Sequence, residues 1–210
     1  MSAGEATAET EAVRRPAARV SNADRTLQSR TAILAATEGI MREEGYAAVS
    51  SRRIAAAAGL KSQLVHYHFK TMDDLYFALL RQVEEAFFQR LAEAMASRTP
   101  LRALWAVCRD PHGPGLNKEF MAMATHHPVL RDEIARSAER TRTILAAQIA
   151  RALPENDIAL EAWPPLALAV LMDGAARLIL ADGALGASLG HKEAIAFVEA
   201  QIDRLEGQRG

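Results

Sequence analysis

The chain has 210 residues, of which 50% are apolar and 24% are charged, and its formal net charge is −1. This balance is typical of a globular protein and excludes a disordered or collagen-like chain. A single cysteine excludes an internal disulfide, and no pair of Cys-x-x-Cys type indicates a zinc site, so the sequence favours a reducing, cytoplasmic setting. The longest apolar run, residues 166–172, is far shorter than the roughly 20 residues that span a bilayer, so we expect no membrane partner.

Alanine is abundant and aromatic residues make up only 5% of the chain, which favours helices over strands. The sequence therefore predicts an all-α fold. Residues 1–24 are rich in Ala, Glu, Thr and Arg, contain Pro16 and lack a helical apolar stripe. Because such a segment buries too little apolar surface to order itself, we expect a flexible amino-terminal arm.

A helix is predicted over residues 25–44, because apolar side chains recur there at steps of three and four, and Gly45 ends it. Two short helices are predicted over residues 51–58 and 62–69. The turn between them begins with Gly59, a residue suited to a left-handed helix end. Two helices joined by so short a turn, after a longer supporting helix, form a helix-turn-helix.

Thr71 is predicted to cap a longer helix that reaches about residue 97, with two aspartates in its first turn. Proline and glycine then divide the rest of the chain into further helices. Their expected bounds are 100–110, 116–125, 128–153, 164–182 and 192–206. We therefore expect an arm (1–24), a helix-turn-helix domain (25–72) and a larger helical domain (73–210).

Signatures of enzymes are absent: the sequence contains no GxGxxG, GxxxxGK[ST], HExxH or GxSxG. We therefore expect no catalytic residue, no metal site and no cofactor. His126 and His127 adjoin, but neighbours on a helix point about 100° apart and rarely bind one metal together. We interpret them as a helix end before Pro128.

Charge is distributed unevenly along the chain. Residues 14–70 hold ten lysines and arginines against four acids, a net charge of +6, whereas the rest of the chain carries −7. A basic helix-turn-helix on an acidic chain is typical of a protein that docks on duplex DNA, because neutralising phosphates supplies most of the non-specific affinity. The alternative is an ordinary solvated basic face.

Five segments in and around the helix-turn-helix stand at a characteristic spacing: Gly45-Tyr46, Ser50-Ser51-Arg52-Arg53-Ile54-Ala55, Ala58-Gly59-Leu60, Val65-His66-Tyr67-His68-Phe69 and Thr71-Met72-Asp73-Asp74-Leu75. Together they resemble the DNA-binding domain of TetR-family transcriptional regulators, over about residues 30–77. The resemblance implies a larger helical domain that binds an effector and dimerises. It further implies a homodimeric, ligand-responsive repressor that binds a palindromic operator at the nucleoid.

The resemblance also places the second short helix in the major groove and implies a set of DNA-binding residues: Ser51, Arg52, Ser62, Gln63, Leu64, His66, Tyr67, His68, Lys70 and Thr71. Among them, Gln63 is suited to pair with adenine, and Leu64 to contact a thymine methyl. Tyr67 and His68 are suited to hold phosphates. The three-helix core is expected to contain Ile54, Ala55, Ala58, Val65 and Phe69.

Two positions depart from the family pattern. The family usually has Tyr where this chain has His66, and Lys where it has Met72. Loss of that lysine removes a phosphate contact, although Thr71 and the helix amino terminus remain available to a phosphate. Arginines of the arm, at positions 14, 15 and 19, are candidates to compensate in the minor groove.

One helix-turn-helix reads few base pairs, so a specific operator requires a second copy of the chain. The expected dimer interface is an apolar face of the last two helices: Leu168, Leu171, Ala175, Leu178, Ile179, Ile195, Val198, Ile202 and Leu205. The alternative is that this face covers the core of one chain.

An unidentified small-molecule effector is expected among the central helices. The candidate pocket residues are Trp105, Phe120, Met121, Met123, His126, Met172, Asp173 and Arg177, although most such side chains serve only packing. A rival interpretation keeps the fold but treats the chain as a helical binding or carrier protein whose amino-terminal module is only structural.

Overall fold

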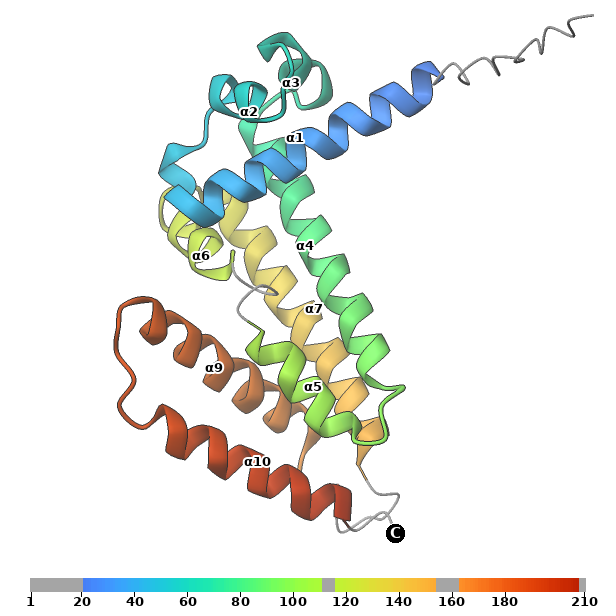
Figure 1. The fold of residues 1–210 in the computed structure, drawn as a ribbon, viewed down its shortest axis with the longest axis vertical. Helices are drawn as coiled ribbons and strands as arrows, with labels where there is room; N and C mark the ends of the chain where they lie inside the picture. Colours follow the sequence, from blue (N-terminus) through green and yellow to red (C-terminus); the bar gives the residue numbers. More distant parts are fainter. Residues whose placement is uncertain (1–20, 111–115, 154–162, 208–210) are drawn as a thin grey trace, which may run out of the picture.

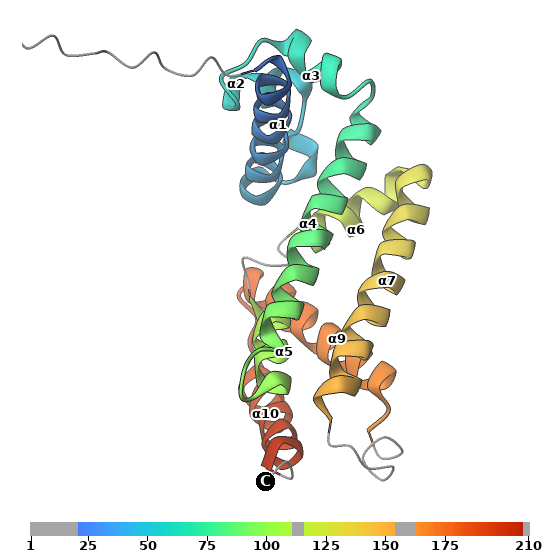
Figure 2. The same ribbon diagram turned by 90° about the vertical axis from the view of Figure 1, so that its right-hand side faces the viewer.

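The structure is a computed structural model that describes residues 21–110, 116–153 and 163–207, and within these ranges its regular elements are all helices. The chain forms an elongated molecule, with the helix-turn-helix at one end and the last two helices at the other (Figures 1 and 2). The elements are α1 (Asn22–Glu44), η1 (Tyr46–Ala48), α2 (Ser51–Ala57), α3 (Ser62–His68), α4 (Met72–Ala94), α5 (Pro100–Arg109), α6 (Asn117–His126), α7 (Pro128–Ala152), α9 (Pro165–Ala184) and α10 (His191–Gly207). The all-α prediction is confirmed.

Helix α1 begins at Asn22, three residues before the predicted start. The reason is a capping box, in which the Ser21 side chain accepts a hydrogen bond from the Asp24 backbone and the Asp24 side chain accepts one from the Ser21 backbone. Residues 22–24 therefore belong to α1 and not to an arm. Residues 1–20, which include the three arginines proposed for the minor groove, lie outside the described residues.

The helix-turn-helix forms as the sequence predicts. Gly59 has φ +66°, the left-handed conformation expected at the end of α2, and Gly45 ends α1 with φ +85°. Of the expected core residues, Ile54, Ala55, Val65 and Phe69 are buried, whereas Ala58 is only half-buried. Burying these side chains against α1 fixes α2 and α3 on one side of that helix.

Helix α4 connects the two ends of the molecule. Its amino terminus carries the predicted cap: the Asp74 N–H donates to the Thr71 hydroxyl, and the Thr71 N–H donates to the Asp74 carboxylate, both at 3.0 Å. The helix ends at Ala94, three residues earlier than predicted, where the chain turns toward α5.

Two clusters of buried side chains fill the molecule, and α4 contributes to both. The upper core joins α1, α2, α3 and the first half of α4 to α6 and the start of α7; its buried members are Ile33, Leu34, Ile40, Met41, Ile54, Ala55, Val65, Phe69, Leu75, Tyr76, Leu79, Leu80, Leu116, Phe120, Met123, Leu130 and Ile134. The lower core joins the second half of α4 to α5, α7, α9 and α10; its buried members are Phe87, Leu91, Ala94, Leu101, Leu104, Trp105, Cys108, Leu145, Ile149, Ala152, Leu153, Ala169, Met172, Ala176, Ile202 and Leu205. Helix α6 thus packs with the helix-turn-helix end of the molecule, although it follows α5 in the sequence.

The expected bounds of the remaining helices agree with the structure to within two residues. Helix α9 is the one that runs furthest beyond its prediction, to Ala184, so Gly183, which was expected to begin the following loop, lies in its last turn. Among the described residues, no helix is both long and apolar enough to cross a membrane.

Candidate nucleic-acid interface

Helix α3 presents one polar face to solvent and buries the opposite face. Ser62, Gln63, His66 and Tyr67 are exposed, and Tyr67 has 71% of its surface accessible. Val65, on the opposite face, is buried in the upper core. The steps of three and four between the exposed residues place them along a single strip of a seven-residue helix. Leu64 lies beside this strip and is half-buried.

His68 faces α1, although it was predicted to hold a phosphate. Its Nε2 lies 2.7 Å from the Ser29 hydroxyl, and its ring is half-buried. Burial of the ring is the main cause that lowers the pKa of His68, and the nearby charge of Arg30 lowers it further. While Nε2 is bonded to Ser29, that nitrogen is not available to DNA. The ring therefore joins α3 to α1 in this structure.

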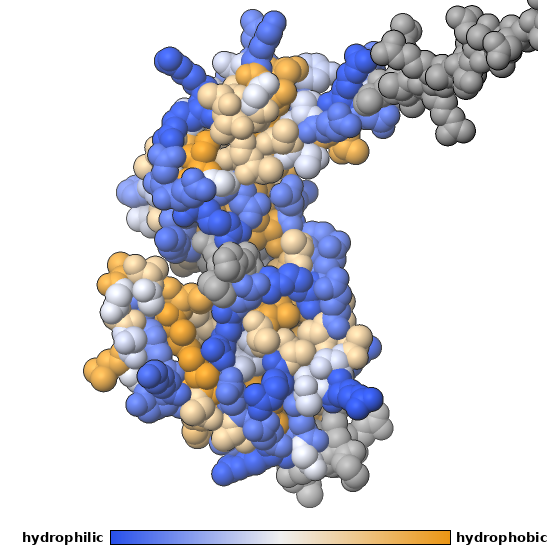
Figure 3. Space-filling view, in the orientation of Figure 1, coloured by the Kyte–Doolittle hydropathy of each residue, from blue (hydrophilic) through white to orange (hydrophobic). Residues whose placement is uncertain are grey.

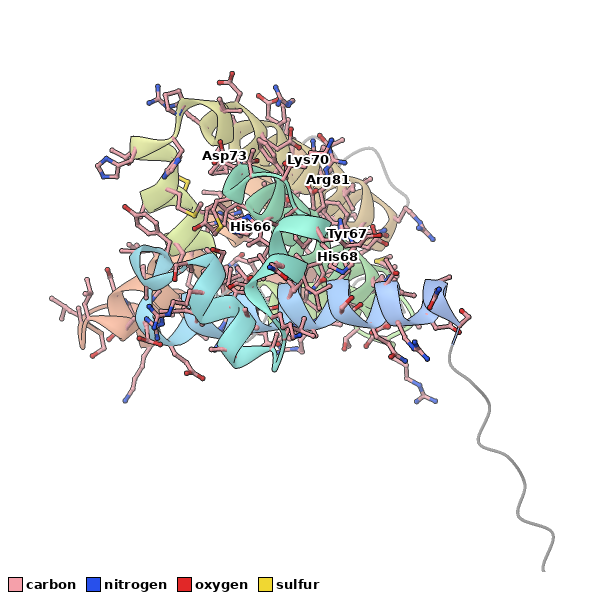
Figure 4. All side chains as sticks on the ribbon, turned by 90° about the horizontal axis from the view of Figure 1, so that it is seen from above. His66, Tyr67, His68, Lys70, Asp73 and Arg81 are labelled. Atoms are coloured by element: carbon pink, nitrogen blue, oxygen red, sulfur yellow. The ribbon has the colours of Figure 1, made fainter. Side chains whose placement is uncertain are left out.

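A second contact also joins the end of α3 to α1. The Arg30 guanidinium lies over the Phe69 ring, 4.7 Å from its centroid. Figure 4, which views the molecule from the helix-turn-helix end, shows His66, Tyr67 and Lys70 around α3 and the start of α4, with His68 lying toward α1. Neither Ser29 nor Arg30 was singled out from the sequence, because each meets its partner only across the fold.

The two arginines of α2 differ in their partners. Arg53 forms an ion pair with Glu44 and donates to the Ala48 carbonyl at 3.4 Å. Arg52 is exposed, and within the described parts of the chain it makes no ion pair, so its charge remains available to a phosphate. Ser51, next to it, is half-buried.

The start of α4 adds further polar groups beside α3. Lys70 and Thr71 are exposed, and Thr71 also caps α4. Met72, which replaces the usual family lysine, packs against the upper core. Lys61 is exposed just before α3 and was not among the predicted contacts, although the basic count of this region includes it.

A small cavity with a volume of about 40 Å³ lies between helices α4, α6, α7 and α9. Its lining residues are Leu80, Val83, Glu84, Phe87, Phe120, Ser137, Thr141, Asp173 and Arg177. Three of the eight candidate pocket residues line it, namely Phe120, Asp173 and Arg177. The other six lining residues, among them Glu84, Ser137 and Thr141, were not predicted, because contacts between separate helices cannot be read from periodicity.

The other candidate pocket residues lie elsewhere. Met123 is buried in the upper core, and Trp105 and Met172 are buried in the lower core. Met121 and His126 are exposed on α6. These five side chains do not line the cavity.

Ion pairs surround the cavity. Arg140 binds both oxygens of Glu84 at 3.0 Å, which ties α7 to α4, and it also contacts Glu133 at 3.2 Å. Burial alone raises the pKa of Glu133, but hydrogen bonds from Arg136 and Arg140 outweigh it and lower that pKa. On α9, the Arg177 Nε donates to Asp173 at 2.8 Å. The acids of the cavity are thus neutralised by arginines.

The expected dimer face divides in two. Leu171 and Leu178 on α9 are 67% and 60% exposed, whereas Ile202 and Leu205 on α10 are each only 5% exposed and belong to the lower core. Ile202 and Leu205 therefore have almost no surface left for a partner, because they pack inside their own chain. Leu168, Ala175, Ile195 and Val198 are half-buried at the edge of this core, and Ile179 is half-buried as well.

Further apolar side chains are exposed on the same part of the molecule. Leu166 and Val170 on α9 belong to the apolar run 166–172, which was expected to contribute to the interface, whereas Phe197 on α10, and Leu185 and Leu189 between the two helices, were not predicted. In the space-filling view, hydrophobic residues gather over α9 (Figure 3). Large exposed apolar patches are uncommon on monomers and often mark interaction sites.

Comparison with known proteins agrees with this geometry. Residues 33–79 match the family of bacterial regulatory proteins described as the tetR family. The HTH-type transcriptional regulator CymR of Pseudomonas putida is 24% identical over 151 residues, which cover 66% of this chain and 74% of CymR.

Solved structures share the fold over most of the chain. A TetR transcription regulator from Haloarcula marismortui aligns with a TM-score of 0.64 and 23% identity, over 85% of this chain and 98% of that one. The multidrug binding protein EbrR, complexed with imidazole, aligns with a TM-score of 0.56 and 27% identity, over 81% and 93% of the two chains. The match over residues 33–79 identifies a DNA-binding domain of the tetR family, and the curated relative and the shared fold agree with a transcriptional regulator of TetR type.

Proposed function

We propose that this protein is a ligand-responsive repressor that binds a palindromic operator as a homodimer. The observation that carries the proposal is the exposed strip of α3, which α1 holds in place through the Ser29–His68 and Arg30–Phe69 contacts. A recognition helix must be fixed relative to its domain, because base contacts depend on register within the groove. The protein would act on the chromosome, at the nucleoid.

The residues divide by role according to their exposure. Gln63 and His66 lie on the exposed strip and are assigned to bases, with Leu64 at its edge. Arg52, Lys70 and Thr71 are assigned to phosphates. Further phosphate contacts are assigned to Ser51, Ser62 and Tyr67.

The homodimer is supported by the exposed apolar face of α9 and α10. Leu171, Leu178 and Phe197 stand at least 60% exposed on it. A two-fold pair built on this face would carry two recognition helices, as a palindrome requires, and these must lie about 34–36 Å apart to enter successive major grooves.

The effector site is proposed at the cavity between α4, α6, α7 and α9. EbrR has been solved complexed with proflavin, with a TM-score of 0.52 and 26% identity to this chain, so a relative of the same fold accepts a small molecule. The cavity of about 40 Å³ is far smaller than the roughly 300–1,000 Å³ of typical ligand pockets, so an effector has to widen it.

Selection from a random duplex library tests the proposal. The full chain should enrich a palindromic sequence whose half-sites are one or more helical turns apart, and its affinity should fall steeply with salt. A carrier protein with a merely structural amino-terminal module would enrich no sequence, even at low salt. That result would refute the regulator and favour the carrier.

A further inference from the structure

Helix α6 carries two adjacent residues that face different parts of the molecule. Glu119 reaches toward the helix-turn-helix, where its Oε2 accepts a hydrogen bond of 2.7 Å from the backbone N–H of Tyr46. Phe120, the next residue, is 2% exposed and lines the central cavity. A movement of this part of α6 therefore affects both places at once.

The contact with Glu119 is made at the turn that carries α2 and α3. Tyr46 opens η1, the short helix that follows α1 and leads into α2. Gly45 precedes it with φ +85°, and a Cβ atom at Gly45 would lie 3.3 Å from the Glu119 Oε2. Glycine at this position thus permits both the left-handed conformation and the close approach of the carboxylate.

The size of the cavity makes movement of its walls unavoidable. About 40 Å³ is well below the 150 Å³ or so of a cavity known to hold one benzene molecule, so an aromatic or branched effector displaces the side chains around it. Two of the walls, α4 and α7, are tied to each other by the bidentate pair of Glu84 and Arg140. Phe120 is the wall residue next to the link with the helix-turn-helix.

We infer that Glu119 is a positioning residue that couples occupancy of the central cavity to the placement of the helix-turn-helix. A ligand that displaces Phe120 shifts Glu119 with it, and the carboxylate then draws the Tyr46 turn along or releases it. In both cases α2 and α3 change their placement relative to α4. The inference rests on the proposed function, because it names the route by which an effector would change DNA binding.

A substitution serves as the probe in place of an unidentified effector. Thr141→Phe introduces a ring into the cavity from α7, and the ring exceeds the available volume. Thr143→Phe is the matched control, because it places the same side chain on the same helix at an exposed position outside the cavity lining. Circular dichroism checks folding, and Val83→Phe, from the α4 wall, replaces Thr141→Phe if that variant does not fold.

The first readout is hydrogen exchange at the Tyr46 amide, measured without DNA. Thr141→Phe should change this exchange rate at least about fivefold, the lower end of common allosteric couplings, whereas Thr143→Phe should leave it as in the wild type. Glu119→Ala removes the acceptor, so in that background Thr141→Phe should have no further effect. Glu119→Gln keeps a carbonyl oxygen for the N–H and should retain the response.

The second readout is affinity for a duplex selected by the wild-type protein. Thr141→Phe should change this affinity at least about fivefold, and Glu119→Ala should abolish that change. An equal effect of Thr141→Phe with and without Glu119, or an unaltered Tyr46 exchange rate in a folded cavity variant, would overturn the inference. If the wild type selects no duplex, the regulator proposal fails, while the exchange experiment still decides the role of Glu119.

Discussion

At the scale of single residues, the sequence predicts which side chains of α3 are exposed, but it does not predict which side chains on other helices they contact. Gln63 and Tyr67 are exposed because Val65 and Phe69 occupy the opposite, apolar face, and that alternation is visible in the sequence. The contact of His68 with Ser29 joins residues 39 positions apart, so no local pattern indicates it.

Gln63→Ala and Arg52→Ala should weaken DNA binding in different ways. Loss of the Gln63 amide should cost about 1–3 kcal/mol on the preferred duplex and relax selectivity at one base pair. Loss of the Arg52 charge should weaken binding to all duplexes alike and reduce the salt slope by about 1. Fluorescence anisotropy on the selected duplex and its single-base variants, at several salt concentrations, distinguishes the two. Equal losses on every duplex for both variants would remove Gln63 from base recognition.

His68 should make stability depend on pH. Because its pKa is lowered in the folded state, the unfolded chain binds the proton more readily, and folding is favoured when the ring is neutral. The free energy of unfolding should therefore fall as the pH drops from the ordinary value of 6.5 through the lower pKa of the folded protein.

His68→Gln should flatten this pH dependence in urea unfolding experiments between pH 7 and pH 5. His66→Gln is the control, because it removes an imidazole from the same helix and leaves the Ser29 contact in place. A profile for His68→Gln as steep as that of the wild type would assign the pH dependence to other groups.

At the scale of elements, helix ends are set by local chemistry. Thr71 and Asp74 form the predicted cap of α4, and Ser21 and Asp24 form a similar box that begins α1. The second box is also readable from the sequence, since a serine followed by an acid three residues later is its usual signature. The early end of α4 is not readable, because its apolar pattern continues through Met95.

Two glycine substitutions should have opposite effects on stability. A Cβ at Gly59 or at Gly39 meets no atom within 4 Å, so both sites have room. Gly59 has φ +66°, where an L side chain costs about 1–2 kcal/mol, so Gly59→Ala should destabilise the protein. Gly39 lies inside α1, where Ala is favoured by about 0.5–1 kcal/mol, so Gly39→Ala should stabilise it. Thermal unfolding of both variants checks the two signs, and a shift of the same sign in both would contradict the conformational argument.

At the scale of the whole molecule, the apolar face of α9 and α10 is expected to control assembly. Leu178→Asp places a charge on the exposed part of that face, so sedimentation velocity should detect a monomer that retains a wild-type circular dichroism spectrum. Its affinity for the palindrome should fall, because only one recognition helix then binds. Val129→Asp, at an exposed apolar position on α7, is the control and should remain dimeric.

Ile202→Ala should behave differently from Leu178→Asp. Because Ile202 is buried in the lower core, its truncation should destabilise the fold by about 2–5 kcal/mol and leave the oligomeric state of the folded protein unchanged. Chemical unfolding together with sedimentation velocity measures both quantities. If the Ile202→Ala dimer dissociated without loss of stability, Ile202 would be a residue of the dimer interface and not of the core.

The presence of the helices, the Thr71 cap, the turn at Gly59 and the polar strip of α3 could all be predicted from sequence, because each depends on residues a few positions apart. Only the tertiary structure decided which apolar faces remain open. An apolar stripe shows that a side of a helix is covered but not by what, so Leu178 and Ile202 are alike in sequence and opposite in exposure. The cavity and the contact between Glu119 and Tyr46, 73 residues apart, likewise exist only once separate helices are brought together.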